Sequence, residues 1–299
     1  MARLAFLGSP EAAVPSLEAL VRAGHDVALC VSRHDARRGR GAATGPSPVK
    51  RAALELGIEV SDRVDDVVDS GAELGVVVAY GRLVPARVIE AVPMLNVHFS
   101  LLPRWRGAAP VERAILAGDS ETGVSIMRLD EGLDTGPVVA VERVAIGPDE
   151  HAAGLRGRLA DVGARLVVEV LGPGPGAVPA GEPQRGEPTY AAKLDPDELR
   201  LDWARPATEL ARVVRLDRAW TTFRGARLRV LEATARPGGA GDRDAVGSLG
   251  ATAVPTGAGL LELRVVQPAG RRAVAATEWL RGVRPVPGER LGGPGNSDR

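Results

Sequence analysis

Three side chains in this sequence are of types that together could carry out acyl transfer. Asn96 and His98 occupy alternate positions in the apolar run 95–99, so a β-strand would project both from the same face. Asp134 follows in a glycine-flanked loop. An amide and an imidazole can hold a reacting carbonyl group, and a carboxylate can favour the charged imidazole and help remove a proton. These residues predict acyl transfer without a covalent enzyme intermediate.

Each of these residues also has a purely structural interpretation. Asn96 and His98 could cap the end of a buried strand, and a lone histidine in a strand is more often structural than catalytic. The glycine-rich carboxylate loop and the turn-rich loop 100–110 that flank the pair favour catalysis. An extended apolar loop beside a polar pair would also make a good wall for a flat heterocycle.

A doubly wound, mostly parallel α/β sheet is expected to position these residues. Strands are predicted at 4–7, 26–31, 58–60, 74–79, 95–99 and 123–129, and helices at 11–23, 47–56, 84–91, after 110, and at 152–171. The run 74–79 is almost entirely apolar, as in a parallel sheet covered on both faces. Ligands of such sheets bind beyond the carboxyl ends of the strands, which is where Asn96 and His98 would lie.

A second domain is expected after the glycine- and proline-rich break 172–176. The predicted limits are a catalytic domain at 1–172, an interdomain linker at 173–206 and a C-terminal domain at 207–299. The last of these contains a helical pattern at 205–217, followed by short apolar strands at 227–231, 247–254 and 260–266. Short strands separated by glycine-rich turns are typical of a small, OB-like β-barrel.

Charge is unevenly distributed along the 299 residues although the net charge is zero. Residues 205–299 contain 16 Arg against 9 Asp or Glu, a balance of +7, which leaves −7 for residues 1–204. Either a polyanionic partner or a compositional bias toward arginine would explain this. The loop 32–46 contains Arg33, Arg37, Arg38 and Arg40, and it is either a solvated surface loop or a basic flap that closes on a phosphate backbone.

Several classes of protein are excluded by what the sequence lacks. Cys30 is the only cysteine, so no internal disulfide is possible, and the four histidines lack metal-site spacing. Only one glycine of the dinucleotide-binding fingerprint follows the first strand, which argues against nicotinamide and flavin chemistry. No apolar run approaches the roughly 18–20 residues of a membrane span, and no secretory signal opens the chain. We expect a soluble, cytoplasmic protein.

Several segments closely resemble the methionyl-tRNA formyltransferase family. The matching segments are Val76-Val77-Val78-Ala79-Tyr80-Gly81, Asn96-Val97-His98, the whole loop 100–110, Gly132-Leu133-Asp134-Thr135-Gly136, Pro46-Ser47-Pro48-Val49-Lys50 and Gln267-Pro268-Ala269-Gly270-Arg271-Arg272. The resemblance runs from the first strand almost to Leu291. The Asn/His/Asp set is shared with all 10-formyltetrahydrofolate transferases, whereas the arginine loop and the C-terminal domain narrow the substrate to tRNA.

The resemblance implies transfer of the formyl group of 10-formyltetrahydrofolate to the α-amino group of methionyl initiator tRNA, which gives formyl-methionyl-tRNA for translation initiation. It implies a formyltransferase-like Rossmann variant followed by an OB-like, tRNA-binding barrel. The implied roles are catalysis by Asn96, His98 and Asp134, folate contacts by Ser100, Leu101, Leu102 and Pro103, and tRNA contacts by Arg40. The co-substrate is then 10-formyltetrahydrofolate and the partner is tRNA, with no metal and no membrane, in a monomer.

Three departures from the family pattern bear on these expectations. Phe99 stands where the family often has a small residue, which could change the floor of the pocket. The loop 32–45 lacks the usual Pro-Asp-Arg-Pro pattern but keeps Gly39-Arg40-Gly41, and Arg218-Ala219-Trp220 replaces Asn-Pro-Trp. Two alternatives remain: a formyltransferase acting on an amino-sugar nucleotide or a purine ribotide, and a non-catalytic tRNA-binding protein.

Overall fold

The chain is divided into two compact units, each described here by itself. The computed structural model describes residues 2–37, 44–172, 180–238 and 245–293. The first unit comprises Met1–Arg113, Ser120–Ile146 and Gly154–Lys193, and the second comprises Ala114–Asp119, Gly147–Ala153 and Leu194–Arg299. Both units therefore draw on more than one stretch of the chain.

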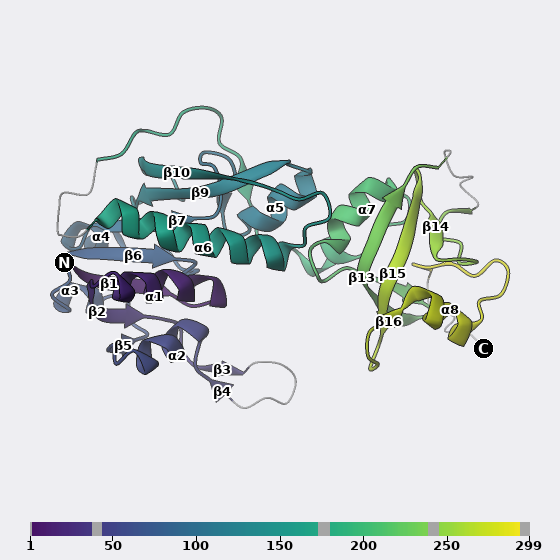
Figure 1. Cartoon of the computed structure of the whole chain (residues 1–299), viewed down its shortest axis with the longest axis horizontal. Helices are drawn as coiled ribbons and strands as arrows, with labels where there is room; N and C mark the ends of the chain where they lie inside the picture. Colours follow the sequence, from purple (N-terminus) through teal and green to yellow (C-terminus); the bar gives the residue numbers. More distant parts are fainter. Residues whose placement is uncertain (1, 38–43, 173–179, 239–244, 294–299) are drawn as a thin grey trace. The chain divides into compact units, whose positions relative to one another are not determined.

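A seven-stranded sheet forms the centre of the first unit in the described part of the chain (Figure 1). Its order is β10-β9-β7-β6-β1-β2-β5. The strands are β1 (Arg3–Gly8), β2 (Asp26–Val31), β5 (Val60–Ser61), β6 (Leu74–Val78), β7 (Met94–His98), β9 (Glu121–Arg128) and β10 (Val138–Ala145). The first five are parallel to one another, and β9 and β10 run antiparallel at one edge. Two short pairs lie outside this sheet, β3 (Ala36–Arg37) with β4 (Thr44–Gly45), and β8 (Arg106–Gly107) with β11 (Tyr190–Ala191).

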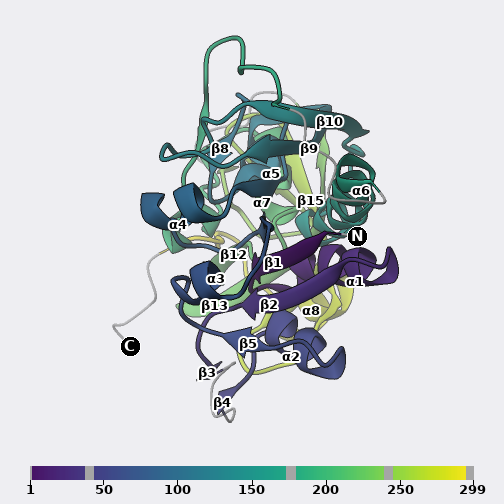
Figure 2. The same cartoon turned by 90° about the vertical axis from the view of Figure 1, so that its left-hand side faces the viewer.

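Helices cover both faces of this sheet (Figure 2). They are α1 (Val14–Arg22) after a 3-10 turn at Glu11–Ala13, α2 (Pro48–Glu55), α3 (Asp66–Asp69), α4 (Ala86–Ala91), α5 (Pro110–Ala117) and α6 (Ala152–Leu171). One face packs Ala5 and Leu7 of β1 in a buried cluster with Val67 of α3 and Val88 of α4. Figure 2 places α1 and α6 on the opposite side of the sheet from α3 and α4. Every residue of β1 after Arg3 is buried, so both faces of this strand need a covering layer.

The mostly parallel sheet expected from the sequence is confirmed, with differences at its edge. The strand at 26–31 and the helix at 152–171 have the predicted bounds. The edge strand β10 was not predicted, although its first four residues are apolar; most of its side chains are exposed or half-buried. The predicted helix 11–23 begins as a 3-10 turn and becomes α-helical only at Val14.

Helix α6 lies unusually close to the sheet at Gly163. A Cβ at this position would come within 2.7 Å of Val97 in β7 and within 3.5 Å of the Phe99 ring. A glycine is therefore required for the helix to approach the strand. Because Val97 and Phe99 face α6, the alternate residues Asn96 and His98 face the other side of the sheet.

The second unit is an antiparallel half-barrel with helices, as expected from the short strands in its sequence. Its sheet has the order β12-β13-β15-β14, with β16 also paired to β15. The strands are β12 (Trp220–Phe223), β13 (Ala226–Arg236), β14 (Ala253–Pro255), β15 (Leu260–Pro268) and β16 (Val274–Ala275), with a 3-10 turn at Pro196–Leu199 and the helices α7 (Ala207–Val214) and α8 (Ala276–Val283). Strand β12 and helix α8 were not predicted. The predicted strand 247–254 is wrong over most of its length, because a turn closed by the Ser248 N–H and the Ala245 carbonyl precedes β14.

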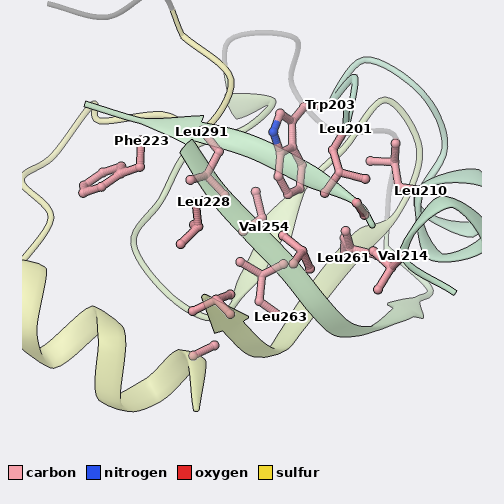
Figure 3. Close-up of a cluster of buried hydrophobic side chains, with 14 of the residues drawn as sticks. Leu201, Trp203, Leu210, Val214, Phe223, Leu228, Val254, Leu261, Leu263 and Leu291 are labelled. Carbon is pink, nitrogen blue, oxygen red and sulfur yellow. The ribbon is translucent and has the colours of Figure 1, made fainter. Parts of the chain in front are cut away.

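A buried apolar cluster holds the second unit together (Figure 3). Leu210 and Val214 of α7 pack with Leu228 of β13 and Leu261 of β15. Trp203, which lies outside any strand, is buried in the same cluster, and its indole N–H donates to Thr221 at 3.0 Å. A buried indole needs such an acceptor, so Trp203 adds apolar contact without leaving a polar atom unpaired.

The segment predicted as a linker is structured where it is described. Residues 173–179 lie outside the described residues, whereas β11 pairs in parallel with β8 of the first unit. Leu199, Leu201 and Trp203 are buried in the second unit. The change from one compact unit to the other falls between Lys193 and Leu194.

Candidate active site

Strand β7 presents the amide and the imidazole that the sequence analysis singled out. Asn96 and His98 lie on one face of its carboxyl end and are 8% and 6% exposed. Parallel pairing with β6 and antiparallel pairing with β9 hold this end of the strand on both sides. The two polar groups are therefore placed on a rigid element at the edge where α/β sheets bind ligands.

Asp134 lies against both of these side chains. Its Oδ1 accepts a hydrogen bond from Asn96 Nδ2 at 3.3 Å, and its Oδ2 lies 3.6 Å from His98 Nδ1. Oδ2 also accepts from the Gly107 N–H at 2.7 Å. An amide and a backbone N–H thus hold the Asp134 carboxylate in place. The structure thus brings together the three residues that were expected to act together.

The tautomer of His98 follows from its other partner. His98 Nε2 lies 2.9 Å from the carbonyl oxygen of Trp105, and a carbonyl oxygen can only accept, so Nε2 carries a proton. The Nδ1 atom then faces the Asp134 carboxylate.

The loop after β7 is fixed by hydrogen bonds to its backbone. The Ser100 hydroxyl donates to the Arg104 carbonyl at 2.5 Å, while Ser125 of β9 donates to the Ser100 carbonyl at 2.7 Å and accepts from the Leu102 N–H. The Leu101 side chain packs on β9 at Gly123. Leu102 and Pro103 are half-buried, so apolar surface remains at the rim of the loop.

The loop that holds Asp134 is equally constrained. Asp130 Oδ1 accepts from the Gly132 N–H at 3.1 Å and from the Thr135 hydroxyl at 2.7 Å. A Cβ at Gly136 would overlap the carbonyl oxygen of Arg128, so only glycine fits there. Asp134 itself has a φ of 52°, a left-handed conformation that aspartate tolerates better than most residues.

Two further residues at this site were missed by sequence reasoning. Gln184 hydrogen-bonds the Asp134 loop and Arg106, and the Thr189 hydroxyl accepts from the Trp105 N–H at 2.9 Å. Both lie in the glycine- and proline-rich stretch that was predicted to be a linker. The available signal for a strand there was the pair Thr189-Tyr190, two residue types common in strands, followed by Ala191 and Ala192.

Phe99 does not form the floor of the site. Its ring approaches Gly163 of α6, on the opposite face of β7 from Asn96 and His98. The expectation that this residue changes the pocket is therefore wrong, because the strand alternation turns its side chain to the other layer.

Of the two basic regions expected from the sequence, the structure describes the one in the second unit but not the segment around Arg40. Arg40 and the motif Gly39-Arg40-Gly41 lie outside the described residues. In the second unit, a cavity of about 730 Å³ is lined by Arg224, Arg227, Arg271 and Arg272 around an apolar floor that includes Trp279. Its acidic lining residue is Glu278. This is a cationic surface of the kind that attracts phosphates.

Other groups considered in the sequence have no part in the site. Cys30 is buried, and burial raises the pKa of its thiol to about 12, so it stays an unreactive thiol. In the described part of the chain, no group of three His, Cys, Asp or Glu side chains is arranged to hold a metal ion. Among the same residues, no helix is long and apolar enough to cross a membrane.

Comparisons with known proteins cover nearly the whole chain. A family model described as formyl transferase matches residues 2–171, and one described as formyl transferase, C-terminal domain, matches residues 193–284. A methionyl-tRNA formyltransferase of Dinoroseobacter shibae is 45% identical over 301 residues, which cover 94% of this chain and 97% of that protein.

Solved structures with the same fold include two that were determined with folate compounds bound. An N-formyltransferase from Helicobacter canadensis, in complex with folinic acid and dTDP-3-aminofucose, matches with a TM-score of 0.67 and 16% identity over 91% of this chain and 100% of that one. HypX from Aquifex aeolicus, in complex with tetrahydrofolic acid, matches with a TM-score of 0.61 and 17% identity over 93% of this chain and 47% of that one. At these identities the likeness is one of fold.

Proposed function

This chain belongs to the methionyl-tRNA formyltransferase family and has that family's activity, and we propose that Asn96, His98 and Asp134 are the residues that carry out the transfer. The observation that supports this most strongly is the contact of all three side chains at the carboxyl end of β7. The formyl donor in this proposal is 10-formyltetrahydrofolate, and the acceptor is the α-amino group of methionyl initiator tRNA. The reaction belongs to translation initiation, and the proposed location of the enzyme is the cytoplasm.

The reaction is an attack by the amine nitrogen on the formyl carbon. A new carbon–nitrogen bond forms, and the carbonyl electron pair moves onto oxygen to give a tetrahedral oxyanion. When that pair returns, the bond from carbon to N10 of the folate breaks, N10 takes up a proton, and the amine nitrogen loses one. No nucleophilic serine or cysteine is needed, because the amine itself forms the new bond.

Two donors at the site suit the oxyanion. The Asn96 amide nitrogen carries two hydrogens, and its bond to Asp134 uses one of them. His98 donates through Nε2 to the Trp105 carbonyl, so the Nδ1–H of an imidazolium is the ring donor left for substrate. Its separation of 3.6 Å from Asp134 is too long for a good hydrogen bond. Removing one such oxyanion donor typically lowers turnover on the order of 100–1,000-fold.

Asp134 has two tasks in this mechanism. Its carboxylate lies 3.6 Å from His98 Nδ1 and so helps to orient that ring, and it can accept the proton that the attacking amine loses, directly or through water. Its bonds to Asn96 and to the Gly107 N–H hold it in place before substrate arrives, so little reorganisation is required during the reaction.

The folate is proposed to lie along residues 100–103. Leu102 and Pro103 offer half-buried apolar surface for a flat ring. Ser100 and Leu101 have their side chains engaged elsewhere, so they would contribute mainly by fixing the backbone of the loop.

The tRNA is proposed to bind the basic surface of the second unit and the loop around Arg40. Arg227, Arg271 and Arg272 of the cavity lining support the first part, since phosphate contacts dominate protein–RNA affinity. Arg224 is paired with Glu289. The contribution of Arg40 rests on the family resemblance of its loop.

One assay tests the proposed function. The purified chain is incubated with 10-formyltetrahydrofolate and methionyl initiator tRNA, and the ester is then hydrolysed and analysed for formyl-methionine. Parallel reactions contain an amino-sugar nucleotide or a purine ribotide precursor as acceptor. Formylation of either small acceptor in preference to the tRNA would contradict the proposal, as would binding of tRNA without formyl transfer.

A further inference from the structure

We propose that Gln184 is a positioning residue of the formyl transfer, and that it acts by locking the Asp134 loop to the Arg106 strand. This inference rests on the proposed catalytic role of Asn96, His98 and Asp134. Gln184 lies in the stretch between residues 171 and 193, which neither family model covers. It nevertheless belongs to the first unit.

The side-chain amide of Gln184 contacts the Asp134 loop through its nitrogen. Nε2 donates to the Asp134 carbonyl and to the Gly136 carbonyl, each at 2.8 Å. These two bonds fix the backbone at Asp134, whose φ is 52°, and two residues after it. A residue in a left-handed conformation keeps it only when its surroundings fix it, so Gln184 helps to aim the Asp134 carboxylate.

The oxygen of the same amide contacts the neighbouring loop. Gln184 Oε1 accepts from Arg106 Nε at 3.1 Å and from Arg106 Nη2 at 2.7 Å. Arg106 lies between Trp105, whose carbonyl accepts from His98, and Gly107, whose N–H donates to Asp134. The Gln184 side chain therefore connects the loop that carries Asp134 to the segment around Arg106, whose backbone contacts His98 and Asp134.

The orientation of this amide is determined by its partners. Carbonyl oxygens can only accept and a guanidinium can only donate, so exchange of the amide oxygen and nitrogen would break all four bonds. Within the same segment, β11 pairs with β8 and Thr189 accepts from the Trp105 N–H. The Arg106 strand is thus held independently of Gln184. The backbone of the Asp134 loop is held to it by Gln184, alongside the bond from the Gly107 N–H to the Asp134 carboxylate and the Glu182–Val138 bridge.

Two substitutions separate the two halves of this link. Gln184→Leu keeps a similar volume and removes all four hydrogen bonds. Gln184→Glu keeps the acceptor for Arg106 but removes the donors and places a negative charge against two carbonyl oxygens. Glu187→Ala, at an exposed position three residues along, is the matched control.

The measurement is the single-turnover rate constant with full-length enzyme in excess over methionyl-tRNA at saturating 10-formyltetrahydrofolate. A purely structural role would lower the active fraction but leave this rate constant unchanged. We expect Gln184→Leu and Gln184→Glu each to lower it at least tenfold, because small displacements of catalytic groups have effects of this size. The affinity for tRNA and the rate constant of Glu187→Ala should stay within twofold of the parent.

The double variant Asp134→Ala/Gln184→Leu tests whether Gln184 acts through Asp134. Because the two effects should not add, Gln184→Leu should change the rate constant less than twofold in the Asp134→Ala background. Additive effects would overturn the proposed route, and so would a Gln184→Glu enzyme as fast as the parent. If Asp134→Ala is strongly slowed and the rate constant of Gln184→Leu equals that of the parent, only this inference fails. If Asp134→Ala is fully active, the catalytic assignment fails first.

Discussion

The carboxyl end of β7 and the basic cavity of the second unit place their polar groups in opposite environments. At the first, Asn96 and His98 are almost fully buried, and each contacts other protein groups. At the second, arginines such as Arg271 and Arg272 are exposed on a rim around apolar side chains. Hydrogen bonds between buried groups in a fixed network are strong and insensitive to salt. Exposed charges attract opposite charges at long range, but salt screens that attraction.

This difference matches two separate tasks. Chemistry requires donors that are already oriented when charge develops on the substrate. Recognition of a polyanion requires many weak contacts whose strength is additive and depends on ionic strength. Substitutions in the two regions should therefore differ in which quantity they change: the rate constant of transfer for the first, and the affinity for tRNA for the second.

The largest effect is expected at His98. His98→Ala should lower turnover on the order of 1,000-fold while the chain stays folded, because it removes an oxyanion donor and the partner of Asp134. Steady-state kinetics together with thermal unfolding measures both properties. Phe99→Leu is the control, because Phe99 is the next residue but faces α6. It should lower stability without comparable loss of turnover. Near-normal turnover in folded His98→Ala would show that the buried groups at the end of β7 do not carry out the transfer.

A second large effect should sharpen the distinction between chemistry and binding. Asp134→Asn keeps the shape of the side chain and loses its charge, so turnover should fall on the order of 100-fold while folate affinity changes little. Folate binding by calorimetry and turnover are measured on the same preparation. If affinity falls greatly and turnover is unchanged, Asp134 is a binding residue instead.

A smaller effect is expected in the basic cavity. Arg272→Glu should weaken tRNA binding several-fold and reduce the slope of log affinity against log salt by about one, because one phosphate contact is lost. Folate affinity should not change. The control is Arg22→Glu, which makes the same change of charge on helix α1 of the first unit, where Arg22 is also exposed. Equal losses of tRNA affinity in both variants would indicate that only overall charge matters.

The smallest effect concerns a buried group that neither region uses. His25 is buried, its Nε2 has no hydrogen-bond partner among the described residues, and burial lowers the pKa of its side chain from the ordinary value. The unfolded chain, with a histidine pKa of about 6.5, then binds more protons than the folded chain, so stability should fall as the pH drops below that value. His25→Leu should flatten this part of the pH dependence of the unfolding free energy. Turnover should be unaffected, and an unchanged pH dependence would contradict the assignment.

The sequence alone predicted the pairing of Asn96 with His98, because strand alternation is a local rule. The same rule, applied to Phe99, would have placed its side chain on the opposite layer. Family resemblance suggested a role in the pocket instead, and the structure contradicts it. The alternation of side chains along a strand thus predicts the position of the Phe99 side chain better than the family resemblance does.

Gln184 could not be predicted in this way. Its partners Arg106 and Asp134 lie 78 and 50 residues earlier in the chain, and no local pattern encodes such contacts. The proline and glycine residues around it are typical of a linker, so nothing in the sequence indicates that the Gln184 side chain makes tertiary contacts. Strand β10 was also missed: its apolar start at residues 138–141 is short, and a short apolar run is an ambiguous signal for a strand.

The pairing of β8 with β11 also has a consequence for the order in which the protein folds. The bond between the Trp105 N–H and Thr189 closes a loop of 84 residues, and contacts so distant in sequence form late because their entropy of closure is large. On the ribosome, the sheet from β1 to β9 can be complete before Gln184 and Thr189 have been synthesised. We expect the nascent chain to acquire a stable core first and a catalytically competent site only after its 189th residue has emerged.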